Sequence, residues 1–367
     1  MAYVAVKGGQ KAIQNSINLM EYNRKKGSSV LLETEQIKDQ LFFLIDRIMS
    51  EGSLYAPDLA AVAIKQTCGD ILEASFVLRA YRATKSRVGY SIAHKTDKMR
   101  VIRRISASFK EVPGGQILGA SLDYTLRLLD YDLVKEDDFD REAMLGQLFP
   151  DLNGADYPDI FPKIVDLLKK EKLIEIKPLD HFQQEQEPFD ITRESIQFPA
   201  SRSAVLQTMA RGETGGMLLL AYSNMRGFGM VHPVIGELRV GYLPVEIEHP
   251  YEKSIYRVGE IKVTEAEIIS ATFSSEPSSI PKFSLGYGLC FGHNETKAIS
   301  MAVLDRAMQT SQPKSASEDQ EFVLSHIDGI ESVGFCNHYK LPHYVSFQSA
   351  LDRVRFAQDK KKKESPE

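Results

Sequence analysis

The chain has 367 residues, of which 43% are hydrophobic and 26% are charged, and its formal net charge at pH 7 is −5. This length predicts two or three domains with a sizeable core. A weakly acidic balance argues against a protein whose main partner is nucleic acid, because such proteins usually carry a basic excess. The cysteines, Cys68, Cys290 and Cys336, are scattered and odd in number, which does not indicate a disulfide framework.

Neither end of the sequence shows a targeting or membrane signal. The N-terminal stretch carries an early lysine, Lys7, and no run of eighteen apolar residues occurs anywhere. We therefore expect a cytoplasmic protein without membrane contact. Residues 357–367 include four consecutive lysines and are typical of a disordered charged tail.

Helical periodicity dominates the first third of the chain. A short β-type run over residues 3–6 leads through the turn Lys7-Gly8-Gly9 into a helical segment. Further helical patterns cover residues 34–52 and 57–84, and another helix is expected around residues 124–130. Residues 1–134 are therefore predicted to form a mainly helical N-terminal domain.

The remaining sequence changes character twice. Residues 135–197 are acidic, glutamine-rich and broken by proline, which indicates a connecting module with one helix. Over residues 198–356, β-rich runs accompany a helix that starts near Asn294, so this part is predicted to be a mixed α/β domain. The predicted fold class is α+β, a mostly helical N-terminal domain followed by a mixed α/β C-terminal domain, without a Rossmann or P-loop core.

Two glycine-rich turns could bind an anion. In the first, Lys7, Gly8 and Gly9 precede a helix whose free N–H groups favour negative charge, but the lysine comes before the glycines, unlike in a Walker loop. In the second, Gly286, Gly288 and Gly292 have a GxGxxxG spacing, which is one residue longer than the dinucleotide fingerprint. The alternatives are a tight turn at the first site and close backbone packing in a sheet at the second.

Several arginines could hold a polyphosphate. Guanidinium groups match phosphate oxygens in pairs, so a triphosphate bound without a P-loop requires convergent basic residues from different segments. The candidates are Lys7, Arg103, Arg104, Arg226 and Arg239. Surface or interface ion pairs are the alternative role for each arginine.

The stretch "GFCNHYKLPH" places His338 and His343 five residues apart, in a chain with eight histidines. This spacing does not fit one helical face, and Pro342 disfavours helical geometry at Leu341, so both histidines are expected on a loop or extended turn. Imidazole nitrogen suits zinc, but zinc takes three or four protein ligands. From the spacing alone, hydrogen-bonded structural histidines are the alternative to a metal site.

Long stretches spread over nearly the whole chain resemble one protein family. They are "YVAVKGGQKAI", "RRISASFKEVPGGQILG", "DYTLRLLDY", "FPASRSAVLQTMARGE", "LAYSNMRGFGMVHPVIGELRVGY", "GYGLCFGHNETKAISMAVLDRA" and "EFVLSHIDGIESVGFCNHYKLPHYVSFQ". In order and spacing, these stretches resemble the PhnI subunits of the bacterial carbon–phosphorus lyase core complex. The acidic region over residues 135–195 and the lysine tail carry no such resemblance.

The resemblance implies a role in phosphonate catabolism. With the G, H and L subunits, such a subunit displaces adenine from ATP with methylphosphonate and forms α-D-ribose 1-methylphosphonate 5-triphosphate. Alone, it resembles a purine nucleosidase. Radical cleavage of the carbon–phosphorus bond belongs to the J subunit, so this chain is expected to need no iron–sulfur cluster.

The resemblance also implies cofactors and partners. The family's HxxxxH motif, which binds zinc near the J subunit, carries over onto His338 and His343. ATP is the implied substrate, with magnesium, and the implied assembly contains the G, H, J, L and K subunits and two copies of this chain. The residue that protonates the leaving adenine is not identified.

Two other functions remain alternatives. The chain could be a scaffold whose zinc and interfaces complete a site on partner subunits. It could also be a metal-dependent phosphoester hydrolase, which would release phosphate and not free base.

Overall fold

The fold is described from a computed structural model. It covers residues 9–135, 140–148, 158, 160–174, 187–228, 233–272, 280–310 and 312–364. The strand expected over residues 3–6 lies outside these ranges, as do Lys7 and Gly8, and Gly9 precedes the first helix, α1 (Gln10–Lys25). Among the described helices, none is long and apolar enough to cross a membrane.

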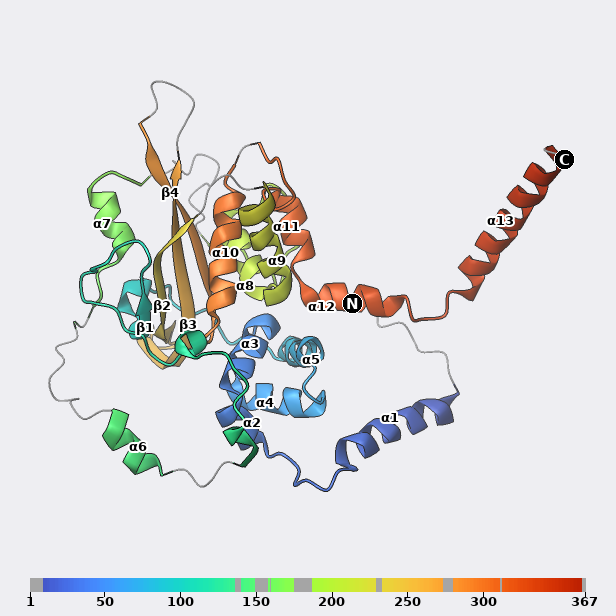
Figure 1. The fold of residues 1–367 in the computed structure, drawn as a ribbon, viewed down its shortest axis with the longest axis horizontal. Coiled ribbons are helices and arrows are strands. Elements are labelled where there is room, and N and C mark those ends of the chain that lie inside the picture. The colour runs from blue at the N-terminus through green and yellow to red at the C-terminus, as the bar shows by residue number, and fades with distance from the viewer. Residues whose placement is uncertain are drawn as a thin grey trace.

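The N-terminal part is helical, as predicted. Four of its helices form a small apolar core around Ile45, Ile48, Ile64 and Leu78. They are α2 (Thr34–Gln40), α3 (Phe42–Gly52), α4 (Pro57–Gln66) and α5 (Ile71–Ala83). The helix expected over residues 34–52 is divided at Leu41, whose backbone leaves the helical region. Helix α1 has no buried residue, and its Met20 and Arg24 line a pocket together with Ile37 of this core, while its N-terminal end lies away from the core (Figure 1).

A four-stranded antiparallel sheet follows, with strand order β1-β2-β3-β4. Its strands are β1 (Arg100–Ile105), β2 (Val234–Glu248), β3 (Ile255–Thr272) and β4 (Lys282–Phe291). The sheet and the helices around it confirm the α+β class. Strand β1 comes from the first 134 residues yet pairs with β2, so the polypeptide before residue 134 contributes directly to the sheet. The predicted domain limits at residues 134, 197 and 356 stay a prediction.

Helices cover both faces of the sheet. One face carries α10 (Glu295–Ala307), together with α8 (Arg202–Arg211), α9 (Thr214–Ser223) and α11 (Gln320–His326) (Figure 1). A Cβ at Gly286 or Gly288 would lie 2.1 or 2.2 Å from a carbonyl oxygen of α10. Of the two roles considered for these glycines, close packing is therefore confirmed.

The middle region contains more structure than the single helix expected there. Helix α7 (Ile164–Lys170) packs Ile164, Val165 and Leu168 near Ile269 of β3, on the sheet's other face. A second helix, α6 (Arg141–Leu148), precedes α7 in the chain. The helix expected at residues 124–130 does not form, because Arg127 adopts a left-handed backbone with φ of 55°, and only a short 3₁₀ turn, η2 (Leu122–Tyr124), is present.

Two helices end the described chain, α12 (Gly329–His338) and α13 (Tyr344–Glu364). Helix α13 continues to residue 364, where a disordered tail was expected, and Lys360 and Glu364 pair across one turn at 3.7 Å. Lysine, glutamine and alanine favour helices, which explains the difference. Helix α13 has no buried residue and projects from the body (Figure 1).

Candidate functional site

His338 and His343 face each other across the corner between α12 and α13. The expectation of a loop holds for His343, whereas His338 is the last residue of α12. Their Nε2 atoms are 3.0 Å apart, and the ring planes are nearly perpendicular, at 88°. His343 Nδ1 lies 2.5 Å from the carbonyl oxygen of Leu341. If Nδ1–H donates to this oxygen, Nε2 of His343 presents a lone pair toward His338.

The corner is anchored through the start of α12. Asp328 caps this helix by accepting hydrogen bonds from the backbone N–H groups of Ile330 and Glu331. The same carboxylate pairs with Arg79 of α5 at 2.7 Å and with Arg211 of α8 at 3.3 Å. Two neighbouring helices therefore fix the position of α12.

Two nitrogen donors fit part of a zinc site. At a zinc–nitrogen distance of about 2.0–2.1 Å, tetrahedral ligands stand roughly 3.3 Å apart, close to the observed separation. No group of three metal-ligating side chains occurs within the described part of the chain. Zinc bound here needs a further ligand from outside those residues. Without a metal, the two facing nitrogens would instead share a proton in a hydrogen bond between the rings.

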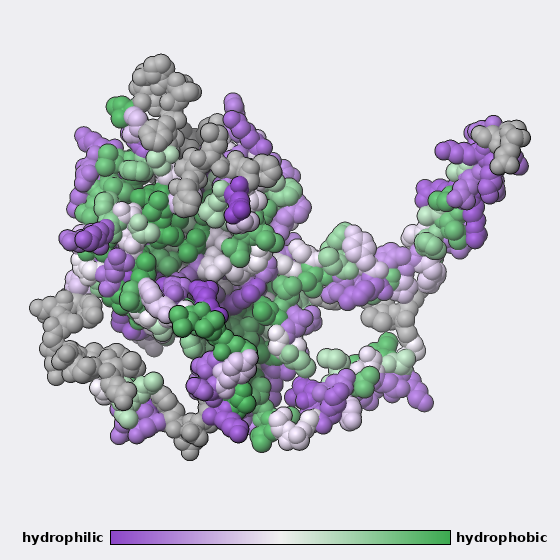
Figure 2. All heavy atoms as spheres, in the orientation of Figure 1, coloured by the Kyte–Doolittle hydropathy of each residue, from purple (hydrophilic) through white to green (hydrophobic). Residues whose placement is uncertain are grey.

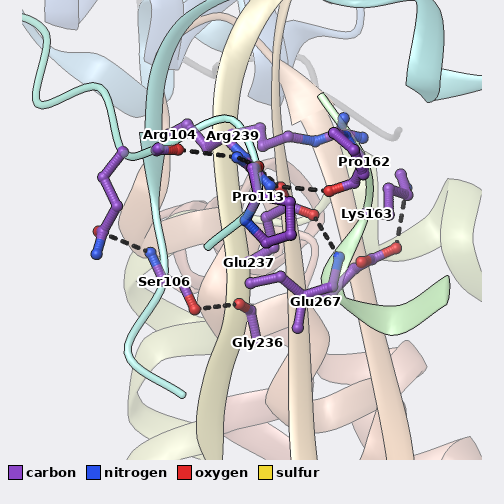
Figure 3. A network of polar contacts seen from close by, with 12 residues as sticks. Arg104, Ser106, Pro113, Pro162, Lys163, Gly236, Glu237, Arg239 and Glu267 are labelled. Atoms are coloured by element: carbon purple, nitrogen blue, oxygen red, sulfur yellow. Dashed lines mark hydrogen bonds and ion pairs between the residues drawn. The ribbon is translucent and has the colours of Figure 1, made fainter. Parts of the chain in front are cut away.

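The structure places Arg104 inside the protein. Its side chain is 1% exposed, and its Nε donates to Glu237 of β2 at 2.5 Å. The remaining guanidinium donors reach the carbonyl oxygens of Pro113, Gly115 and Pro162 (Figure 3). These bonds occupy the guanidinium N–H groups that would have to bind a phosphate. A role of Arg104 on a triphosphate stays a prediction, and it would require these bonds to open.

Arg239 lies beside Arg104 in the strand register but belongs to a second ionic group. Its Nε donates to Glu265 of β3 at 3.0 Å, and Lys163 bridges Glu265 and Glu267, at 2.9 Å from each. Burial alone would raise the pKa of Glu265, but the adjacent Arg239 and Lys163 outweigh it and lower this pKa to about 2. Burial raises the pKa of Glu267.

The other candidate residues are dispersed. Arg103 lies on the opposite face of β1 from Arg104 and donates from Nε to Glu295 at 2.5 Å. Arg226 is exposed on a π-helical turn, η4 (Asn224–Phe228). The structure thus brings Arg103, Arg104 and Arg239 to two neighbouring strands and leaves Arg226 apart.

Sequence reasoning missed the buried acids that pair with these arginines. Glu265 and Glu267 alternate along β3, so they share one face of the sheet. The sequence contained a signal for these acids, because two glutamates spaced two residues apart in a strand indicate that one face of the strand is charged. His293 follows the glycine-rich turn that ends at Gly292, but its contact with Glu295 at the start of α10, 2.6 Å from Nε2 to Oε1, was not predicted.

Comparison with known proteins places the chain in one functional class. A family model described as bacterial phosphonate metabolism protein (PhnI) matches residues 2–361. A putative C-P lyase subunit protein HtxH of Stutzerimonas stutzeri is 50% identical over 365 residues, which are 98% of this chain and 97% of that protein.

Two further relatives carry a more specific name. The alpha-D-ribose 1-methylphosphonate 5-triphosphate synthase subunits PhnI of Rhizobium meliloti (strain 1021) and Escherichia coli (strain K12) are each 42% identical to this chain. The matches cover 96% of this chain and 94% and 97% of those proteins. The chain belongs to the PhnI family.

Proposed function

We propose that this chain is a subunit of an α-D-ribose 1-methylphosphonate 5-triphosphate synthase, within a carbon–phosphorus lyase system of phosphonate catabolism. The observation that carries the proposal is the end-to-end similarity to two proteins of that name, at 42% identity over 96% of the chain. The G, H, J, K and L subunits are the proposed partners, and the complex contains two copies of this chain in the cytoplasm.

The proposed reaction joins methylphosphonate to C1 of the ribose of ATP. A phosphonate oxygen forms the new bond to C1 while the bond from C1 to adenine breaks, and the base leaves with the electron pair. Such a displacement has oxocarbenium character, so it needs a positioned nucleophile and a protonated leaving base. Without partners, water takes the place of the phosphonate and the chain acts as a purine nucleosidase.

We further propose that His338 and His343 hold zinc. The support is their facing Nε2 atoms, 3.0 Å apart, and the carbonyl contact that fixes the ring of His343. Bound there, zinc would polarise an oxygen atom of a ligand. The exposed corner leaves space for a further ligand from substrate or from the J subunit. ATP enters the reaction with magnesium on its phosphates.

Metal analysis tests the histidine pair. The purified complex should contain zinc, and His338→Ala or His343→Ala should remove it, while His249→Ala should not. His249 is a matched control because it is half-buried, as His338 is, and its Nδ1 accepts a local hydrogen bond from the Glu252 backbone N–H at 3.1 Å. Equal zinc content in all four proteins would contradict the assignment.

Product analysis tests the reaction. Chain and partners incubated with ATP and methylphosphonate should release adenine, which chromatography measures, and should release little phosphate. Phosphate without adenine would instead support a phosphoester hydrolase. If the partner subunits released adenine without this chain, the chain would be a scaffold and not a catalytic subunit.

A further inference from the structure

A cleft lies between α3, the segment around η2 and the first turns of α9 and α10. Its volume is about 460 Å³, within the range of small-molecule sites. Phe43, Leu122 and Leu218 give it apolar walls. Its charged or titratable lining residues are Arg47, Asp123, Arg127, His293, Glu295 and Lys297. An aromatic base with attached phosphates needs this combination of surfaces.

His293 is held in this cleft by a carboxylate. Its Nε2 lies 2.6 Å from Glu295 Oε1, and the same oxygen accepts from Nε of the buried Arg103 at 2.5 Å. The backbone N–H of His293 donates to Asp46 at 2.9 Å, and the ring of Phe43 packs at 67° to the imidazole, 5.1 Å away. These contacts fix the direction of the ring.

The other ring nitrogen of His293 is available. Nδ1 makes no hydrogen bond with any described residue, and it is not among the fully buried polar atoms that lack a partner. An imidazole bonded to a carboxylate through one nitrogen and open to a cleft through the other can transfer a proton to a bound ligand.

We propose that the cleft binds the purine nucleotide and that His293 is the general acid of the displacement. This inference rests on the proposed function. The imidazolium gives its Nδ1 proton to N7 of the purine as the bond from ribose C1 to N9 breaks, and the neutral histidine then takes a proton from water. Glu295 is a positioning residue, because it touches His293 and not the reacting atoms.

The charges around His293 suit this role. Glu295 stabilises the imidazolium, and Arg103 keeps Glu295 ionised by bonding to the same carboxylate. Burial alone would raise the pKa of Glu295, but the hydrogen bonds from His293 and Arg103 outweigh it and lower this pKa. The charged groups on the elements that surround the ring are Asp46, Arg47, Arg103, Asp123, Arg127, Glu295 and Lys297.

The phosphates have partners at the rim. The side chain of Arg127 is 70% exposed and has one long contact, 3.4 Å to Asp123. Arg47 is 32% exposed and is already shared between Glu51 and Glu213, at 2.9 and 2.7 Å. Arg127 is thus the better phosphate ligand, since it would lose only one long contact on binding a phosphate, whereas Arg47 would lose two ion pairs.

Substrates with different leaving groups test the acid. Complexes containing the wild-type chain, His293→Gln or His94→Gln would be compared on ATP and on 7-methylguanosine triphosphate, both with methylphosphonate. The methylated base leaves without protonation, because it is already cationic. We expect His293→Gln to slow adenine release by about 100-fold or more and to change release of 7-methylguanine by less than about threefold.

His94 is the matched control, since it also faces a glutamate, with Nε2 3.3 Å from Glu246, but it does not line the cleft. His94→Gln should leave both rates unchanged. Equal losses on both substrates in His293→Gln, or no loss on either, would overturn the inference. Failure of the wild-type complex to release adenine would instead overturn the proposed function.

The pH profile gives an independent readout. On ATP, kcat/KM of the wild type should fall as pH rises, because a general acid must carry its proton to act, and this fall should be absent in His293→Gln. If the wild type does not accept the methylated substrate, this profile decides: the same falling limb in both proteins would overturn the inference.

Discussion

Arg103 and Arg104 are neighbours in sequence, but they point to opposite faces of β1 and meet different acids. Arg103 reaches Glu295 of α10, and Arg104 reaches Glu237 of β2. Their clustering in the sequence predicts phosphate binding, whereas the structure shows buried ion pairs. The sequence could not reveal the pairs, because the acids lie more than a hundred residues further along the chain.

The Arg104–Glu237 pair is predicted to determine stability. Arg104→Met should lower the free energy of unfolding by about 3–5 kcal/mol, because Glu237 would stay buried without its partner. Arg100→Met is the control, since its pair with Glu260 is exposed at 61% and 31%, and it should cost less than about 1 kcal/mol. Urea unfolding measures both. A stable Arg104→Met variant that has lost only nucleotide binding would restore the phosphate role.

A second prediction for a single residue concerns Lys297. It is fully buried, hydrogen-bonded to Ser50 and to the Ala210 carbonyl, and forms no ion pair with a described carboxylate. Burial lowers its pKa to about 8, from 10.5. The unfolded chain therefore holds more protons between about pH 8 and 10.5, so this residue makes stability rise with pH there, by up to about 3 kcal/mol.

Lys297→Met should remove that rise. Unfolding of both proteins in urea at pH 8, 9 and 10 measures it, and the difference between the two curves removes contributions from groups common to both. Parallel curves for wild type and variant would show that Lys297 does not titrate in this range.

At the level of elements, β4 and α10 approach closely because glycines line their contact. Gly288→Ala would place a Cβ 2.2 Å from the Ala298 carbonyl oxygen, and it should lower the free energy of unfolding by about 1–3 kcal/mol. Gly259→Ala on β3 is the matched control, because no atom lies within 4 Å of its Cβ position. Equal stability of the two variants, measured by denaturant unfolding, would contradict this explanation.

Elements with clear apolar periodicity were predictable from sequence, and those stabilised by distant charges were not. The helices within residues 34–52 and 57–84 and the β-rich runs after residue 233 follow their patterns. Strand β1 was not predicted because its two buried side chains, on opposite faces of the strand, are arginines, and an arginine indicates a core position only once its acidic partner is known. The histidine spacing predicted a loop or extended turn, which holds for His343 and not for His338, and it did not predict that the two Nε2 atoms would face each other.

The whole molecule combines a packed body with two helices that bury nothing. Figure 2 shows apolar residues among hydrophilic ones on both α1 and α13, and Ile17 and Phe347 are 57% and 65% exposed. Figure 1 also places the α12–α13 corner away from the start of α10, so the histidine pair and the His293 cleft are separate places in one chain. Metal loss and loss of the general acid should therefore be separable defects.

Deletion of residues 345–367 should leave the midpoint of thermal unfolding unchanged, because no residue of α13 contributes to a core. Deletion of residues 320–326 would be the contrasting case, since α11 buries Val323 and Leu324. Calorimetry compares both with the full chain. A lower midpoint after the α13 deletion would mean that this helix packs against the body in solution.

Identification of the product tests the central claim most directly. Phosphorus NMR of the assembled complex, supplied with ATP and methylphosphonate, should show methylphosphonate entering an ester with a ribose that keeps its 5-triphosphate, with one free adenine for each product. Unchanged methylphosphonate, with ATP intact or hydrolysed to ADP and phosphate, would contradict the proposed synthase function.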